Sequence, residues 1–228
     1  MAAVSLFTRS LGGPATTWLV TSLVAGLTYP LVEPVLPPAA AIGAKGLGVG
    51  LLAVAALHLP TLQRGWLAAI MTAGAVGDVL LELPGLFYTG AAAFAGGHIA
   101  AMLFYSRHRA TDAAVARRLG AAALIGWGLA MPGLVSPPGT AVGALMLYSV
   151  MLCGMAAALL LSRFPVVALV GALLFVVSDT LLIMRLGGNI VSDASVHGWL
   201  VWISYYLGQA LIFVGVGTGL VTQTSEPR

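Results

Sequence analysis

Residues 139–185 read GTAVGALMLYSVMLCGMAAALLLSRFPVVALVGALLFVVSDTLLIMR, and this stretch decides the fold class. It holds two apolar runs separated by a short polar break at Arg163 and Pro165. A helix that crosses the roughly 30 Å hydrocarbon core of a bilayer needs about 20 such residues. We therefore predict two membrane-spanning helices here, over 139–161 and 165–185.

The same pattern continues on both sides of this stretch. Six further apolar windows, bounded by proline and glycine, lie at 14–32, 38–58, 65–83, 89–107, 118–135 and 198–221. Of the 228 residues, 60% are hydrophobic and 7% charged, more apolar surface than a soluble fold of this size could cover. We predict an all-α polytopic membrane protein with eight transmembrane helices, forming a single domain over 1–228.

Composition excludes two other classes of protein. The net charge is +3, but the basic residues are dispersed over short connections and have no aromatic residues between them, unlike a nucleic-acid-binding patch. Cys153 is the only cysteine and lies in an apolar run. It therefore supports neither a disulfide framework nor a Cys/His zinc motif.

Arginine positions predict the orientation, because basic residues concentrate in cytoplasmic connections. With the N-terminus inside, all arginines except Arg185 fall on the inner side: Arg9, Arg64, Arg107, Arg109, Arg117, Arg118, Arg163 and Arg228. We therefore expect both termini to be cytoplasmic.

Polar side chains within the predicted spans are few, and each is costly at membrane depth. The ionisable ones are Lys45, Asp78, Glu82, His98 and Asp179, and their uncharged companions are Tyr148, Tyr205 and Gln209. Counted from the outer ends of the spans, most of them fall in one layer on the order of 10 Å below the surface. This layer predicts a single buried site. Glu82, closer to the outer end, fits a solvated rim position as well as a place in the site.

Two of the spans resemble each other. AAIMTAGAVGDVLLEL (68–83) and VGALLFVVSDTLLIM (170–184) both contain an apolar run, a small residue, Asp, one residue and Leu-Leu. The predicted helices run in the same direction, unlike the inverted repeats of many transporters, which places Asp78 and Asp179 at equal depth. Lys45, the only lysine, is expected to pair with one of these aspartates.

Structural roles are the alternative for each of these residues. A Lys–Asp pair could simply join two helices, and His98 could hydrogen-bond a neighbouring helix. Tyr148 and Tyr205 could be interface anchors or packing residues. The residues alone do not decide between these roles and a shared site.

The stretch GDVLLELPGLFYTGAAAFAGGHIAAMLFY (77–105) resembles the signature of the YhhN-like family, the bacterial relatives of the vertebrate lysoplasmalogenases. That signature is a Gly-Asp at the end of one span, a short linker, and then Gly-x-x-x-Phe and a His on the next. GALLFVVSDTLLIMRL (171–186), YYLGQALI (205–212) and Lys45 extend the resemblance. Two positions differ from the family: Lys45 is followed by Gly46, where proline is common, and Gln209 stands where His is frequent.

The resemblance implies hydrolysis of the vinyl-ether bond of a lysoplasmalogen to a fatty aldehyde and a glycerophospho-ethanolamine or -choline. That reaction needs an acid, an anion and a water. Two carboxylates in a low dielectric cannot both ionise, so one would donate the proton while the other stabilises the cation and activates the water. We therefore expect Asp78 and Asp179 to be catalytic. Lys45, His98, Tyr148, Tyr205, Gln209 and Glu82 would bind substrate or support the site.

The expected partners are the lysophospholipid substrate and membrane lipids, with no cofactor, metal or obligate protein partner, in the bacterial inner (plasma) membrane. Two other functions fit the same residues. Buried Asp, Lys and His also form the proton relays of proton-coupled transporters. A metal-dependent hydrolase could use Asp78, Glu82 and His98 as ligands, although the chain has no HExxH or HxxxH motif.

Overall fold

The computed structural model describes residues 11–136 and 142–225, and helices dominate this part of the chain. The elements are α2 (Gly13–Val32), the 3₁₀ turn η1 (Glu33–Val35), α3 (Pro38–Leu57), α4 (Arg64–Glu82), α5 (Phe87–Arg107), α6 (Val115–Val135), α7 (Val142–Leu160), α8 (Val166–Leu186) and α9 (Ala194–Ser225). Eight of them are long and apolar enough to cross a membrane, and the described residues contain no strand element. The prediction of an all-helical, eight-span membrane protein is confirmed.

Most helix boundaries lie within three residues of the predicted windows. The last helix is the exception, because α9 covers 194–225 and not 198–221. Residues 139–141 of the predicted sixth span lie outside the described part of the chain. Proline and glycine mark the breaks: α3 starts at Pro38 and α8 directly after Pro165. Gly85 and Gly188 both have φ +77 in the connections that follow α4 and α8, a backbone region that favours glycine.

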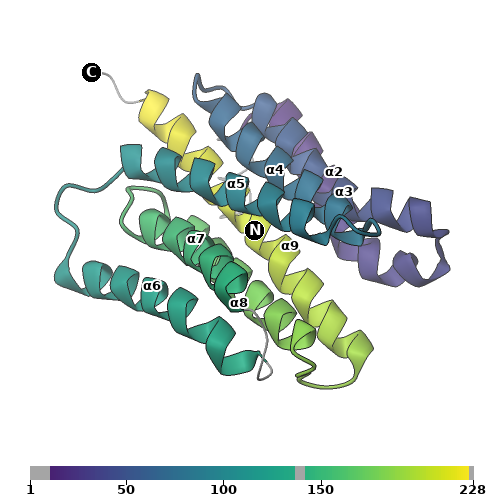
Figure 1. The fold of residues 1–228 in the computed structure, drawn as a ribbon. Coiled ribbons are helices and arrows are strands. Elements are labelled where there is room, and N and C mark those ends of the chain that lie inside the picture. Colours follow the sequence, from purple (N-terminus) through teal and green to yellow (C-terminus); the bar gives the residue numbers. More distant parts are fainter. Residues whose placement is uncertain (1–10, 137–141, 226–228) are drawn as a thin grey trace.

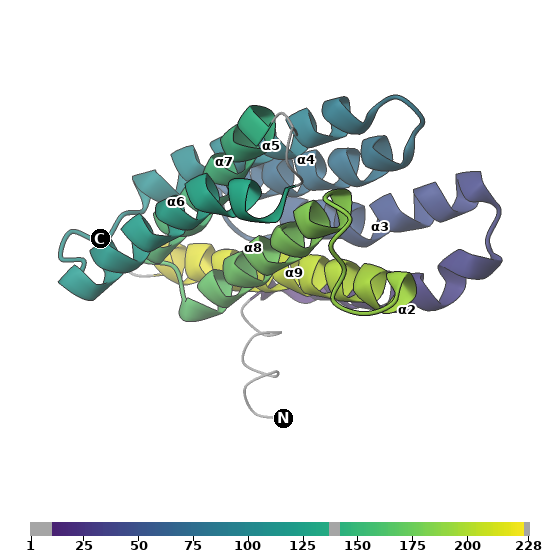
Figure 2. The same ribbon diagram turned by 60° about the horizontal axis from the view of Figure 1, so that its bottom comes forward.

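Helix α9 is the centre of the bundle. It packs against α2, α3, α4 and α8, and Figure 1 shows it running between the group α2–α5 and the group α6–α8. In its apolar window 61% of the residues are buried, compared with 22% for α6, whose main contacts are with α7 and α8. Figure 2 shows α6 at the outside of the bundle. Side chains on α9 therefore have the greatest number of neighbouring helices to meet.

Small residues set the spacing of α8 and α9. A Cβ atom added to Gly171 would lie 2.5 Å from the backbone oxygen of Gly208, and one added to Gly208 would lie 2.8 Å from the oxygen of Gly171. The two backbones therefore touch directly, as small residues allow in membrane helix pairs. This contact fixes the position of Asp179 on α8 relative to Tyr205 on α9.

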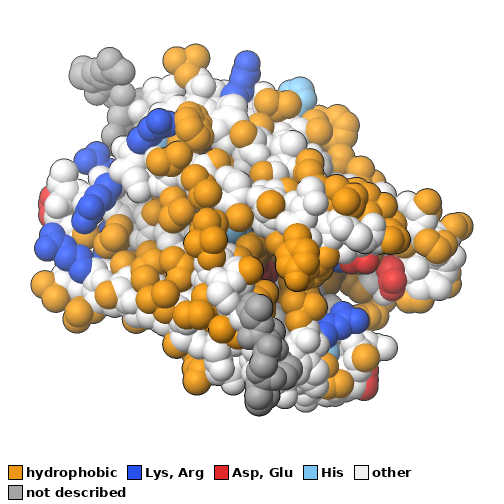
Figure 3. All heavy atoms as spheres, in the orientation of Figure 1, with side chains coloured by type: hydrophobic (Ala, Val, Ile, Leu, Met, Phe, Trp, Pro, Cys, Tyr) orange, Lys and Arg blue, Asp and Glu red, His pale blue; other side chains and the backbone are white. Residues whose placement is uncertain are grey.

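Successive helices run back and forth, so that the connections alternate between two ends of the bundle (Figure 1). One end, called here the arginine-rich end, carries Arg64, Arg107, Arg109, Arg117, Arg118 and Arg163 at the connections α3–α4, α5–α6 and α7–α8. Figure 3 shows most of the visible Lys and Arg side chains along the left and top, with another at the lower right, and hydrophobic side chains over much of the rest of this face. Arg9 and Arg228 lie outside the described residues. The distribution predicted for the other arginines is present, and the side of the membrane that this end faces stays a prediction.

Candidate active site

A large cavity opens at the end of the bundle opposite the arginine-rich end. Its volume is about 510 Å³, within the range of small-molecule sites. Its outer part is lined by Glu33 and Pro34 of η1, Phe87 at the start of α5 and Arg185 near the end of α8. The predicted catalytic residues line its inner part, so the two halves of the chain contribute to one space.

The first polar pair in the cavity joins α4 and α9. Asp78 is 3% exposed, and its Oδ2 accepts a hydrogen bond of 2.8 Å from the hydroxyl of Tyr205. Gln209, one turn further along α9, donates to the Tyr205 oxygen at 3.4 Å. Gly74 makes room for this arrangement, because a Cβ there would lie 2.9 Å from Gln209 Nε2. The absence of a side chain at Gly74 thus lets α9 present two polar groups to α4.

The second polar pair joins α8 and α7. Asp179 is 4% exposed, and its Oδ2 accepts a hydrogen bond of 2.6 Å from the hydroxyl of Tyr148. Both aspartates and both tyrosines line the same cavity, and Asp78 lies within electrostatic range of Asp179. Among the described residues no hydrogen bond joins the two carboxylates. The site therefore consists of two Asp–Tyr pairs that face one space.

Lys45 does not pair with an aspartate, and that prediction is wrong. Its Nζ forms an ion pair with Glu82 on the neighbouring helix α4. It also lies 5.9 Å from the centre of the Trp202 ring. Glu82 is one turn nearer the mouth than Asp78 and its side chain is 43% exposed, so a long flexible ammonium side chain can reach it at a lower desolvation cost. Lys45 still lies within electrostatic range of Asp78.

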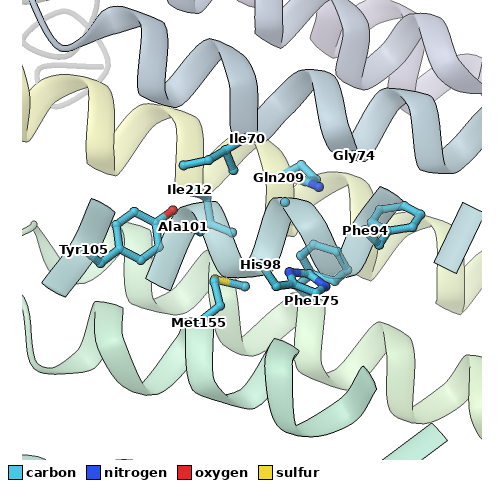
Figure 4. Close-up of a pocket in the computed structure, with 11 residues that line it drawn as sticks. Ile70, Gly74, Phe94, His98, Ala101, Tyr105, Met155, Phe175, Gln209 and Ile212 are labelled. Carbon is cyan, nitrogen blue, oxygen red and sulfur yellow. The ribbon is translucent and has the colours of Figure 1, made fainter. Parts of the chain in front are cut away.

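The prediction of a single polar layer is also wrong in part. His98 and Gln209 do not line the large cavity but a smaller one deeper in the bundle, which Figure 4 shows. The His98 ring packs against Phe175 and Tyr148, with centroid distances of 5.2 and 5.7 Å. Counting residues from the helix ends gives the depth of a side chain but not the direction in which it points. Residues that line two different cavities were therefore predicted to share one layer.

The sequence model of the YhhN family matches residues 40–216. The chain belongs to the YhhN family. No curated protein and no solved structure matches it. The matched range contains both Asp–Tyr pairs, the Lys45–Glu82 ion pair and the deeper cavity, whereas Tyr29, Pro30, Glu33 and Pro34 at the cavity mouth lie before it.

Several cavity residues of this YhhN protein were not anticipated as site residues. Tyr29, Trp199 and Trp202 contribute aromatic surface, and Glu33 and Arg185 contribute charge. Arg185 had been used only as an indicator of topology. Tryptophan near the outer end of a span is typical of any membrane interface, so no local pattern indicates that these residues belong to a site.

A shared metal site of Asp78, Glu82 and His98 does not fit this arrangement. Glu82 is paired with Lys45, and His98 faces a different cavity from the two carboxylates. In the part of the chain that the structure describes, no group of three His, Cys, Asp or Glu residues is close enough to hold an ion. The two Asp–Tyr pairs are therefore the best candidates for functional groups in the large cavity.

Proposed function

We propose that this YhhN protein is an intramembrane hydrolase that cleaves the vinyl-ether bond of a lysoplasmalogen. The observation that carries the proposal is the pair of buried carboxylates, each bound by a tyrosine hydroxyl, in one cavity of substrate size. A buried ionisable group in a membrane span is costly. Two of them facing a shared cavity are better explained by chemistry than by packing.

The two carboxyl groups and one water molecule can supply every atom and proton that the reaction needs. One carboxylic acid gives its proton to the β-carbon of the vinyl ether, which leaves an oxocarbenium ion stabilised by the other carboxylate. Water adds its oxygen to the cationic carbon and its proton passes to a carboxylate. The C–O bond to glycerol then breaks: the glycerol oxygen takes a proton from the carboxylic acid, the hemiacetal hydroxyl gives its proton back to a carboxylate, and the aldehyde is released. Both carboxylates line the same cavity and each accepts one tyrosine hydroxyl, so we assign the acid and base roles to the pair and not to single residues.

The cavity suits a lipid with one chain and a charged head. Apolar side chains such as Leu81, Phe94 and Leu182 line it, and Glu33 and Arg185 add charge near its mouth. Neither of these two has an ion-pair partner among the described residues. Arg185 would bind the phosphate and Glu33 the ammonium of a zwitterionic head group. The site would face outward from a bacterial plasma membrane in which both termini are cytoplasmic.

The proposal predicts that detergent-purified protein releases fatty aldehyde from a defined lysoplasmalogen. Asp78→Asn and Asp179→Asn should each lower the rate by roughly 10²- to 10⁴-fold, the usual contribution of general acid–base catalysis. Asp112→Asn, the same change at an exposed connection, should leave the rate unchanged, and a lysolipid with a saturated ether should give no aldehyde. Release would be followed by an aldehyde-coupled assay, with and without chelator.

Full activity of Asp179→Asn would exclude the two-carboxylate mechanism. Absence of aldehyde from the wild type would exclude the proposed reaction itself. Transport assays in proteoliposomes would then be the next test, since buried carboxylates also serve as proton relays.

A further inference from the structure

The deeper cavity is a second space in the bundle, and the proposed chemistry does not use it. Its lining is mostly apolar, from Ile70, Phe94, Met155, Phe175 and Ile212, and its polar groups are His98, Tyr105 and Gln209. Figure 4 shows Tyr105 at one side of this space, and His98 and Phe175 at the other. Phe94 lines both this cavity and the large one.

Two polar atoms at this cavity have no partner. His98 Nε2 and the Tyr105 hydroxyl are buried and make no hydrogen bond within the protein, and the two residues are 4% and 0% exposed. A buried donor or acceptor without a partner is rare and destabilises the folded protein. Because His98 Nε2 and the Tyr105 hydroxyl border the same small space, we expect one partner to bind both.

The size of the space identifies this partner as water. Its volume for the centres of water molecules is about 20 Å³, and one buried water needs about 10–15 Å³ on this measure. Internal waters usually satisfy two to four polar groups that the protein leaves unpaired. The cavity has room for one water, and at most for two.

We propose that His98, Tyr105 and Gln209 bind resident water in this cavity, and that this water supplies the hydrolysis reaction from the inner side. Gln209 donates to Tyr205, and Tyr205 donates to Asp78, so hydrogen-bonded side chains connect the lining of this cavity to a catalytic carboxylate. The water itself would reach the large cavity by passing Phe94, which lines both spaces. An alkenyl chain that fills the large cavity displaces the water there. The deeper cavity, separated from the large one by Phe94, keeps a water molecule available as the nucleophile. The supply role rests on the proposed function, whereas the water site does not.

The water site can be tested without substrate by X-ray footprinting, in which radicals formed from bound water oxidise the nearest side chains. Tyr105 should be oxidised several-fold faster than Tyr206. Tyr206 is an equally buried control, because its hydroxyl is already bonded to Ser22 at 2.8 Å and it borders neither cavity. Equal rates for the two tyrosines would overturn the proposal.

A cavity-filling variant tests the location and the supply role. Ala101 lines the cavity, and Ala101→Val should reduce Tyr105 oxidation to the level of Tyr206. Ala156→Val, on α7 and equally buried but outside the lining, should not. Oxidation that persists in Ala101→Val would place the water elsewhere.

For the supply role, Ala101→Val should lower kcat for aldehyde release several-fold while leaving unchanged the Kd for a lysolipid with a saturated ether bond. An unchanged kcat would overturn the supply role. If the wild type releases no aldehyde, the supply role falls with the proposed function. The footprinting result would still decide the water site by itself.

Discussion

At the scale of single residues, the tyrosines decide how the two aspartates are held. Each carboxylate accepts one hydroxyl, from Tyr205 or Tyr148, and each tyrosine comes from a helix other than that of its aspartate. Hydrogen bonds to a charged or chargeable group are worth about 1.5–3 kcal/mol. The tyrosines therefore fix the orientation of the carboxyl groups within the cavity.

Tyr148→Phe and Tyr205→Phe should each slow aldehyde release by about tenfold to a hundredfold, the rate equivalent of one such hydrogen bond. Each variant keeps the ring and removes only the hydroxyl. Tyr88→Phe, on the exposed surface of α5, is the control and should behave as the wild type. Steady-state kinetics would measure the effect, and wild-type rates for both cavity variants would show that the tyrosines only pack.

At the scale of elements, the contact between α8 and α9 determines the shape of the site. Asp179 and Tyr205 lie on these two helices, and Gly171 and Gly208 allow their backbones to meet. Because lipid tails are as apolar as the helices, the hydrophobic effect does not drive helix association in a membrane. Close packing of the two helix surfaces therefore provides much of the stability of the pair. A side chain inserted at this contact must push the helices apart.

Gly171→Ala should destabilise the protein by about 1–3 kcal/mol, the usual cost of an overpacked contact. The added methyl group would lie 2.5 Å from the Gly208 oxygen and 2.7 Å from the Ile212 nitrogen. Gly96→Ala, on α5, has no atom within 4 Å of the new Cβ and serves as the control. Thermal unfolding in detergent would compare them. An unchanged Tm for Gly171→Ala would contradict the close contact of α8 and α9.

At the scale of the whole molecule, the two ends of the bundle differ in their charged residues. Six arginines mark one end, and the cavity with Arg185 and Glu33 opens at the other. Cytoplasmic connections collect basic residues, which predicts that the cavity mouth faces outward. A lysolipid would then enter from the outer leaflet.

Cysteine labelling in intact cells tests this orientation. Arg185→Cys should react with a membrane-impermeant maleimide added outside, and Arg118→Cys should react only after the cells are opened. Both positions are exposed, and the native Cys153 is buried, so background labelling is low. Labelling of Arg118→Cys but not Arg185→Cys in intact cells would reverse the predicted topology.

The sequence by itself determined the number, order and approximate bounds of the helices. This was possible because a bilayer imposes a fixed length of apolar residues on each span, and proline or glycine ends it. It also pointed to Asp78, Asp179, Tyr148 and Tyr205 as candidate site residues, since each one interrupts an apolar run where burial is costly, but not to Glu33 or Arg185 at the cavity mouth. The family resemblance over residues 77–105 is likewise readable without a structure, and the match to the YhhN family confirms it.

Only the tertiary structure decided which of these residues meet. Lys45 pairs with Glu82, the two tyrosines divide the two aspartates between them, and His98 faces a second cavity. Position along a helix gives depth, but a partner is set by the rotation of each helix and by the helix packed beside it. Those depend on contacts such as Gly171 with Gly208, between residues far apart in the chain, and no local pattern encodes them.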